Sequence, residues 1–229
     1  MYSVFAKSAT SPDRQKAVRR GPANWICALL PLIFLAACPV YAAAVVDVAQ
    51  YVTAPGGSLV IHGTSTLHNW SAQTKGLSGR AVLDGTWTGR GAQALELKSI
   101  HLVIAVKTLK SSEGGGMDDT MYGALHRRKH ALITYQLTTA SLHAPPAGKN
   151  APAVFNTTGK LRVNGVTRSV PLVLTVTPLA NGDLSIATTV KLKMTEFGVK
   201  PPTAMFGIIR SGNAITVYAT WLLAAKAGA

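Results

Sequence analysis

The sequence NGVTRSVPLVLTVTPLANG spans residues 164–182 and carries an Asn-Gly pair at each end. Asn-Gly is the strongest short-range signal of a β-hairpin turn. Between the two pairs, mostly apolar side chains at even positions alternate with mostly polar side chains at odd positions, apart from Arg168 and Val173. A period of two predicts a β-strand with one buried, apolar face, called the dry face below, and one solvent-exposed, polar face.

The flanking segments, residues 155–164 and 184–194, repeat this alternation. A two-residue loop at Asn164-Gly165 joins the dry faces of the first pair, with Phe155 opposite Leu174. The second loop must be longer, because a one-residue slip would turn every side chain to the wrong face. We predict a three-residue loop at 180–182, with Gly182 in the left-handed conformation. This loop sets three pairs opposite one another: Val176 and Ile186, Leu172 and Val190, Val170 and Leu192.

The predicted strands are long. About a dozen residues at roughly 3.4 Å each make strands of about 40 Å, twice the common length. Long antiparallel strands with one apolar face indicate an all-β protein, either a tall barrel or a sandwich. A tall barrel has room for a long, thin, apolar ligand along its axis.

Residues 1–42 have the features of a signal peptide and are left out of the predicted fold. Basic residues between positions 14 and 20 precede the apolar segment 25–37, and Val40-Tyr41-Ala42 offers small residues for cleavage. Pro31 interrupts the apolar segment, which is also shorter than the ~20 residues that a transmembrane helix needs. We therefore expect export to the periplasm and a single mature domain, residues 43–229.

A second cleavage site competes with the first. Leu35-Ala36-Ala37-Cys38 resembles a lipobox, which would make Cys38 a lipidated first residue at the outer membrane. Pro39 directly follows Cys38, and proline is unusual after a lipobox cysteine, so we favour cleavage after Ala42. Both cysteines of the chain, Cys27 and Cys38, precede that site. Cleavage there leaves no thiol for a disulfide, a nucleophile or a metal site.

The chain is strongly basic, with 23 Lys and Arg against 9 Asp and Glu. Residues 1–42 hold five of the bases and one of the acids, so the remaining chain keeps a net charge of +10. We do not expect nucleic acid as a partner, because aromatic side chains are not interleaved with the basic ones. An anionic membrane surface or an acidic head group explains the charge better.

Further alternating segments complete the expected set of strands. The long segment 95–109 changes phase near Ser99-Ile100, which predicts a bulge or bend. The remaining strands are expected at residues 56–63, 68–72, 78–87, 131–141 and 214–223.

One helix is predicted after the flexible connector 111–116. Asp118 and Asp119 suit its first turn, and an apolar stripe follows at four-residue spacing. We expect this helix to plug or flank one end of the barrel. The stripe consists of Met117, Met121 and Leu125, and the expected last turn holds Arg127, Arg128 and Lys129.

Four segments in this order resemble the YceI-like domain, an exported family that binds polyisoprenoids: 63–70 (GTSTLHNW), 117–125 (MDDTMYGAL), 159–168 (GKLRVNGVTR) and 194–202 (MTEFGVKPP). The resemblance runs from about Ser58 to Leu223. It implies an eight-stranded antiparallel, lipocalin-like barrel with one short helix near an end. It also implies a hydrophobic pore for an isoprenoid chain, such as a quinone tail, and no shared catalytic set.

The inward side chains of a small barrel either fill it or leave a cavity. The resemblance favours a cavity, and the small residues Thr157, Gly159 and Thr188 leave room on the dry face. His68 and Trp70 are predicted to lie at the rim or seal it, and the three cations of the helix end are predicted to attract an anionic head group or membrane. The predicted pore wall consists of Ile104, Met121, Leu125, Tyr135, Phe155, Leu161, Leu172, Leu174, Ile186, Val190, Phe197 and Phe206.

Nothing in the sequence predicts catalysis. His126 and His130 are spaced i, i+4, but the three cations between them disfavour a divalent metal. No Gly-x-Ser-x-Gly motif occurs, and the acids are too dispersed to nominate a pair. We expect no enzyme, no metal and no cofactor besides a bound isoprenoid lipid.

The segment from Phe197 to Phe206 joins the last two long strands, and Pro201-Pro202 forces it into an extended loop. It forms either a lid across an opening or a packed crossover.

The expected function is transport or storage of an isoprenoid chain in the barrel. The alternatives are a ligand-free secreted barrel that acts as an interaction module and an outer-membrane barrel with its apolar face outward.

Overall fold

A computed structural model describes residues 48–85, 87, 95–148 and 150–226. This part of the chain holds one α-helix, α1 (Gly115–Ala124), and the short 3-10 turns η2 (Val106–Thr108), η3 (Met194–Phe197) and η4 (Met205–Gly207). The predictions for residues 1–42, including the lipobox at Cys38, lie outside the described residues. The strands are β1 (Val48–Thr53), β2 (Ser58–Ser65), β3 (Asn69–Thr74), β4 (Leu77–Asp84), β5 (Glu96–Ala105), β6 (Lys110–Ser111), β7 (Leu132–Ala144), β8 (Ala153–Val163), β9 (Val166–Pro178), β10 (Leu184–Lys193), β11 (Thr203–Ala204) and β12 (Ile209–Ala225).

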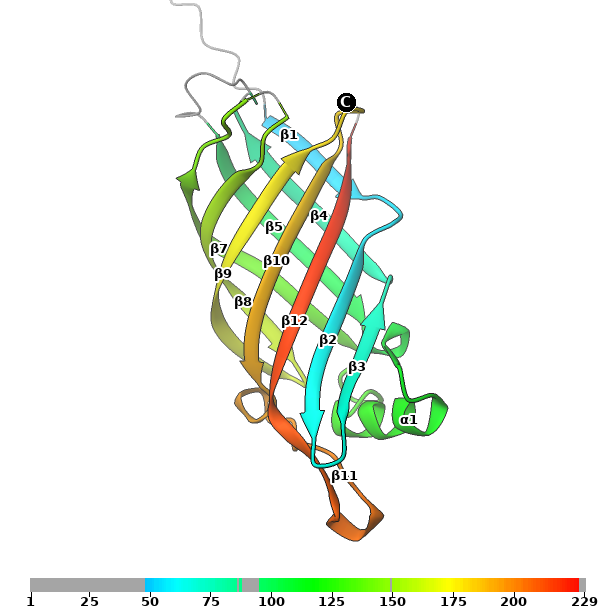
Figure 1. The fold of residues 1–229 in the computed structure, drawn as a ribbon. Helices are drawn as coiled ribbons and strands as arrows, with labels where there is room; N and C mark the ends of the chain where they lie inside the picture. Colours follow the sequence, from blue (N-terminus) through cyan, green and yellow to red (C-terminus); the bar gives the residue numbers. More distant parts are fainter. Residues whose placement is uncertain (1–47, 86, 88–94, 149, 227–229) are drawn as a thin grey trace, which may run out of the picture. The chain divides into compact units, whose positions relative to one another are not determined.

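Antiparallel pairing closes the long strands into an eight-stranded barrel, as expected (Figure 1). β1 pairs with β4 and β2 pairs with β3, so β1–β2 and β3–β4 each act as one interrupted strand. The ring continues through β5, β7, β8, β9 and β10 to β12. β12 closes it, because it pairs with β10 on one side and with β1 and β2 on the other.

Both predicted turns have the expected geometry. Phe155 lies opposite Leu174 across the first turn. Asn164 and Gly165 both have positive φ, 51° and 79°, which is the pattern of a type I′ hairpin. At the second turn, Gly182 has a φ of 85° and Val176 lies opposite Ile186.

The predicted pairing of β9 with β10 is correct only near the turn. It ends at Thr175 opposite Ala187, so the pairs Leu172–Val190 and Val170–Leu192 do not form. Beyond that point the two strands separate. The segment after β10 packs there instead, because Phe197 and Val199 are buried against Val170. The barrel wall is therefore completed by side chains at this place rather than by a hydrogen-bonded ladder.

The change of phase in residues 95–109 is a β-bulge. Val82 lies opposite Ser99 and Leu83 lies opposite Leu97, which leaves Lys98 as the extra residue. β1 was not predicted from the sequence.

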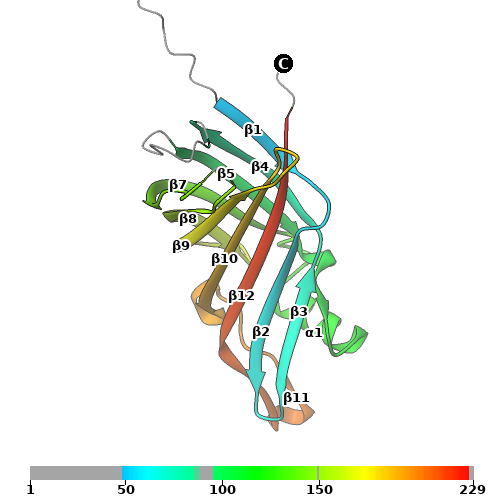
Figure 2. The same ribbon diagram turned by 45° about the horizontal axis from the view of Figure 1, so that its top comes forward.

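Helix α1 lies at the end of the barrel where β3 begins (Figures 1 and 2). It is shorter than predicted, because it ends at Ala124 and His126 has a positive φ of 46°. Arg127, Arg128 and Lys129 therefore follow the helix instead of forming its last turn. No helix among the described residues is long and apolar enough to cross a membrane.

One salt bridge ties α1 to the barrel. The Asp118 carboxylate accepts hydrogen bonds from the Ser111 backbone N–H at 2.6 Å and from Lys110 Nζ at 2.9 Å. These two bonds, the backbone bond above all, lower the pKa of Asp118.

The barrel interior differs between its two ends. We call the end near β1 and the last residues of β12 the packed end, because large apolar side chains meet there. The other end, near α1 and η3, is the mouth end (Figure 2). The packed end is filled by Leu83, Leu97, Phe155, Val176, Leu184 and Leu223, each exposed by 6% or less.

Candidate functional site

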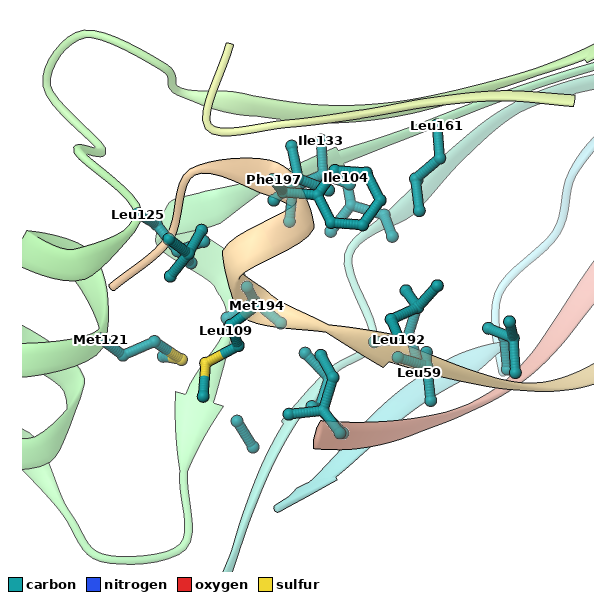
Figure 3. Close-up of a pocket in the computed structure, with 18 of the residues that line it drawn as sticks. Leu59, Ile104, Leu109, Met121, Leu125, Ile133, Leu161, Leu192, Met194 and Phe197 are labelled. Carbon is teal, nitrogen blue, oxygen red and sulfur yellow. The ribbon is translucent and has the colours of Figure 1, made fainter. Parts of the chain in front are cut away.

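A cavity of about 330 Å³ opens at the mouth end and runs along the barrel as far as Leu174, Ile186 and Trp221 (Figure 3). Its wall comes from β2, β3, β5, β7, β8, β9, β10 and β12, and α1 and η3 contribute side chains at the mouth. Nearly all of these side chains are apolar. Most of the few polar ones lie toward the mouth, such as Ser65 and Lys193 at the ends of their strands and His68 in the β2–β3 turn, while Thr188 of β10 lies deeper. The site is therefore an apolar shaft with a polar rim.

All but two of the predicted pore-wall residues line this cavity. Their role in holding a ligand stays a prediction. The residues that line it are Ile104, Met121, Leu125, Tyr135, Leu161, Leu172, Leu174, Ile186, Val190 and Phe197.

Phe155 and Phe206 lie elsewhere. Phe155 is 1% exposed and belongs to the packed end, where it pairs with Leu174 across β8 and β9. Phe206 is fully exposed on the β11–β12 hairpin. The segment from Phe197 to Phe206 is thus neither a complete lid nor a plain packed crossover. Its first part, at Phe197, is buried in the mouth, and its last part projects into solvent.

The sequence prediction missed much of the wall. Leu59 and Ile61 of β2 line the cavity, and so does one face of β12. The period-two alternation that identified the other strands is present in both segments and would have found them. The β12 residues are Ile215, Val217, Ala219 and Trp221.

The space at Gly159 is filled by protein, not left for a ligand. The Tyr135 ring lies across it, so a Cβ at Gly159 would be 2.3 Å from Tyr135 Cζ. The neighbouring Thr157 hydroxyl donates to the Leu172 carbonyl at 2.9 Å. Tyr135 Oη is the one buried side-chain polar atom without a hydrogen-bond partner in the described part of the chain. Burial raises the pKa of Tyr135.

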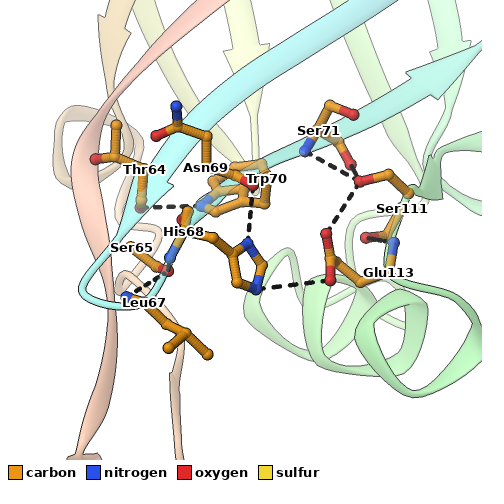
Figure 4. A network of polar contacts seen from close by, with 10 residues as sticks. Thr64, Ser65, Leu67, His68, Asn69, Trp70, Ser71, Ser111 and Glu113 are labelled. Carbon is orange, nitrogen blue, oxygen red and sulfur yellow. Dashed lines mark hydrogen bonds and ion pairs between the residues drawn. The ribbon is translucent and has the colours of Figure 1, made fainter.

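His68 and Trp70 both lie at the rim (Figure 4), and their role toward a ligand stays a prediction. The Trp70 ring covers Gly63, where an added Cβ would be 2.1 Å from Trp70 Cζ2. Its Nε1 donates to the Thr64 carbonyl at 3.0 Å. His68 Nδ1 is 2.8 Å from the Asn69 carbonyl, and its Nε2 lies 3.7 Å from Glu113. These contacts fix both rings at the edge of the cavity.

Two covers close part of the mouth. Met121 extends into it from α1, Leu125 from the residue that caps this helix, and Phe197 from η3 (Figure 3). Asn164, in the β8–β9 turn, links the covers. Its Nδ2 donates to the carbonyls of Phe197 and Gly198 at 3.3 and 3.1 Å. Its Oδ1 therefore faces His126 Nδ1, 2.8 Å away, as an acceptor.

The cations after α1 are not part of the cavity wall. The Arg127 guanidinium lies 4.4 Å from the centre of the Tyr122 ring, a cation–π contact, and Arg128 and Lys129 are exposed. His126 and His130 do not face a common ion, because His126 contacts Asn164 and the His130 ring packs over Gly165. No group of three or more His, Cys, Asp or Glu that would hold a metal occurs among the described residues.

The family of this protein follows from a match over most of its barrel sequence. The YceI-like domain matches residues 51–220. The chain belongs to the YceI-like family. This family is a binding-protein fold and not a known enzyme family. No curated protein matches the chain.

Solved structures agree with this YceI-like barrel in fold. A polyisoprenoid-binding domain from Saccharophagus degradans is 14% identical, with a TM-score of 0.57, 78% of this chain and 99% of that chain being covered. BcnA from Burkholderia cenocepacia is 18% identical, with a TM-score of 0.53 and coverage of 73% and 96%. The YceI protein of Campylobacter jejuni is 16% identical, with a TM-score of 0.50 and coverage of 69% and 85%.

Proposed function

We propose that this YceI-like protein is exported by residues 1–42 and holds an isoprenoid chain in its cavity, for transport or storage in the periplasm. The observation that carries the proposal is an apolar shaft that ends in a polar rim. Such a shape suits an amphiphile with a long tail and a polar head. The similarity to a polyisoprenoid-binding domain supports the choice of tail.

The cavity favours a chain over a compact molecule. Its volume of about 330 Å³ is at the lower end of the ~300–1,000 Å³ range of small-molecule sites. A long tail fills it and continues through the mouth, between the covers of α1 and η3. Each buried methylene contributes about 0.8 kcal/mol before the costs of binding.

The polar head of the ligand belongs at the rim in this proposal. His68 and Lys193 lie there, and Arg128 and Lys129 are exposed after α1. An anionic head group gains from these cations. We propose binding without catalysis, since the residues at the rim hold no nucleophile paired with a base.

The test is native mass spectrometry, with organic extraction, of the protein purified from its own cell envelope. Leu172 and Val173 provide a matched pair, because they are neighbours on β9, but Leu172 lines the cavity and Val173 is 54% exposed. We expect the wild-type protein and Val173→Asp to retain an isoprenoid lipid. Leu172→Asp should lose it, because a carboxylate in the shaft is costly to bury.

Circular dichroism confirms that each variant is folded. A folded Leu172→Asp protein that keeps its lipid would contradict the proposed site. Wild-type protein that yields no lipid on extraction would instead support a ligand-free interaction module.

A further inference from the structure

Three exposed apolar side chains gather at the mouth end. Leu67, Phe206 and Ile208 have exposed fractions of 67%, 111% and 75%. The other large apolar side chains that are exposed in the described part of the chain reach at most 54%. We call these three residues the mouth tip. Exposure of this degree on neighbouring loops is unusual for apolar side chains and marks an interaction site.

Hydrogen bonds join the two loops that carry the mouth tip. Leu67 lies in the β2–β3 turn, and Phe206 and Ile208 lie in the β11–β12 hairpin. Between them, Thr66 N–H donates to the Arg210 carbonyl at 3.0 Å, and Thr66 Oγ1 donates to the Ile208 carbonyl at 3.2 Å. The two loops therefore form one unit. Figure 4 shows Leu67 pointing away from the polar network of the rim.

The backbone of the hairpin holds Phe206 in an unfavourable conformation. Its φ of 53° and ψ of 31° are left-handed values, which cost free energy for a residue with a bulky side chain. The adjacent Arg210 side chain fixes the hairpin by donating from Nε to the Gly207 carbonyl at 2.8 Å. A strained residue that keeps a large apolar ring in water gains from a partner that covers the ring.

Exposed cations lie in the hairpin that carries the mouth tip and elsewhere at the same end of the barrel. Arg210 lies within the hairpin, and Lys200 is exposed at its base, next to Pro201-Pro202. Arg128 and Lys129 are exposed at the same end of the barrel, after α1. Apolar side chains flanked by Lys and Arg complement a lipid bilayer that carries anionic head groups.

The shape of the mouth tip favours a membrane over a protein. A stable protein interface buries about 800 Å² on each partner, whereas the mouth tip consists of a turn and a narrow hairpin that project from the barrel (Figure 1). Single apolar side chains on projecting loops insert between lipids without needing a matching groove.

We propose that the mouth tip docks this protein on an anionic lipid membrane. Leu67, Phe206 and Ile208 enter the head-group region, and the exposed cations at this end contact lipid phosphates. The mouth of the cavity then faces the bilayer. This docking depends on the surface alone and not on which lipid the cavity holds.

The experiment is co-sedimentation of the purified protein with vesicles. The vesicles contain phosphatidylglycerol and phosphatidylethanolamine, or phosphatidylcholine alone. We expect binding to the anionic vesicles only, with binding weakened as salt is raised. The double variant Phe206→Ser/Ile208→Ser should bind at least about tenfold more weakly.

The matched control is Val48→Ser/Val173→Ser, which removes two exposed apolar side chains away from the mouth. It should bind like the wild-type protein. Equal binding by the tip variant and the control would overturn the proposal, and so would wild-type protein that stays in the supernatant with anionic vesicles at low salt. Lipid content, measured on the same samples by native mass spectrometry, tests the carrier function separately.

Discussion

The packed end and the mouth end are built from the same strands, yet one is solid and the other hollow. At the packed end, β9 and β10 are paired, and inward side chains such as Phe155 and Val176 meet. Toward the mouth the same two strands separate, and inward side chains such as Leu172 and Val190 line a cavity. The separation of β9 from β10 therefore accompanies the cavity, which also reaches Ile186 within the paired part of the two strands.

The largest expected effect is at the packed end. Phe155→Ala should lower the free energy of unfolding by about 3–5 kcal/mol, because it removes a fully buried ring from close packing. Leu172→Ala should cost about 2 kcal/mol or less, since Leu172 already faces a cavity and has fewer packing partners to lose. Urea denaturation of lipid-free protein measures both. Equal losses would remove the distinction between the two ends.

The second-largest expected loss of stability is at Gly159, between the packed end and the mouth end. Gly159→Ala should cost about 1–3 kcal/mol, because the new Cβ would lie 2.3 Å from Tyr135 Cζ. Tyr135→Leu in the same chain should recover part of that cost, and a double-mutant cycle measures how much. Strictly additive losses would show that the Tyr135 ring does not occupy the space at Gly159.

The third expected change in the free energy of unfolding is smaller and is a gain in stability. It concerns the unpaired Tyr135 hydroxyl near the cavity. Tyr135→Phe removes Tyr135 Oη, which has no hydrogen-bond partner among the described residues. We expect the lipid-free protein to gain about 1 kcal/mol in denaturation experiments, because a buried unsatisfied donor is costly. A clear loss of stability would mean that the hydroxyl makes a bond in solution.

The smallest effect depends on pH and concerns the cover that α1 provides. The pKa of Asp118 is held below its ordinary value of 3.8. Its contribution is therefore complete above that value and is lost as the pH falls through the lowered pKa. The Tm of the wild-type protein should fall further between pH 5 and pH 3 than that of Asp118→Asn. Parallel curves for the two proteins would rule out this role.

The sequence predicted the strands best where turns defined them. The two Asn-Gly turns set the register of β8, β9 and the start of β10, and the change of phase in β5 revealed its bulge. β1 was missed because its six residues, Val48–Thr53, show no clean alternation of apolar and polar side chains, although Pro55-Gly56-Gly57 marks the turn after them. The end of α1 was misplaced because the run of cations suits a last helical turn, while the contact between His126 and Asn164 stops the helix earlier.

The sequence predicts which face of each strand lines the site, but it does not predict that a cavity lies between these faces. Alternation identifies which side chains point inward, and most of the predicted wall lines the cavity. It does not reveal that β9 and β10 separate, because that depends on Phe197 and Val199, which are close to Val170 only in the folded chain. Phe155 was assigned to the wall because it points inward like its partner Leu174, but its ring is enclosed by close packing instead of facing the cavity.

Asn164 couples the two covers of the mouth to each other. One amide side chain bonds the η3 segment through its nitrogen and the loop after α1 through its oxygen. Neither cover leaves its position without disturbing a bond that also orients the amide for the other. We therefore expect the two covers to open together, so that their backbone amides show similar opening free energies in hydrogen exchange. Replacing this one side chain would let them exchange at separate rates.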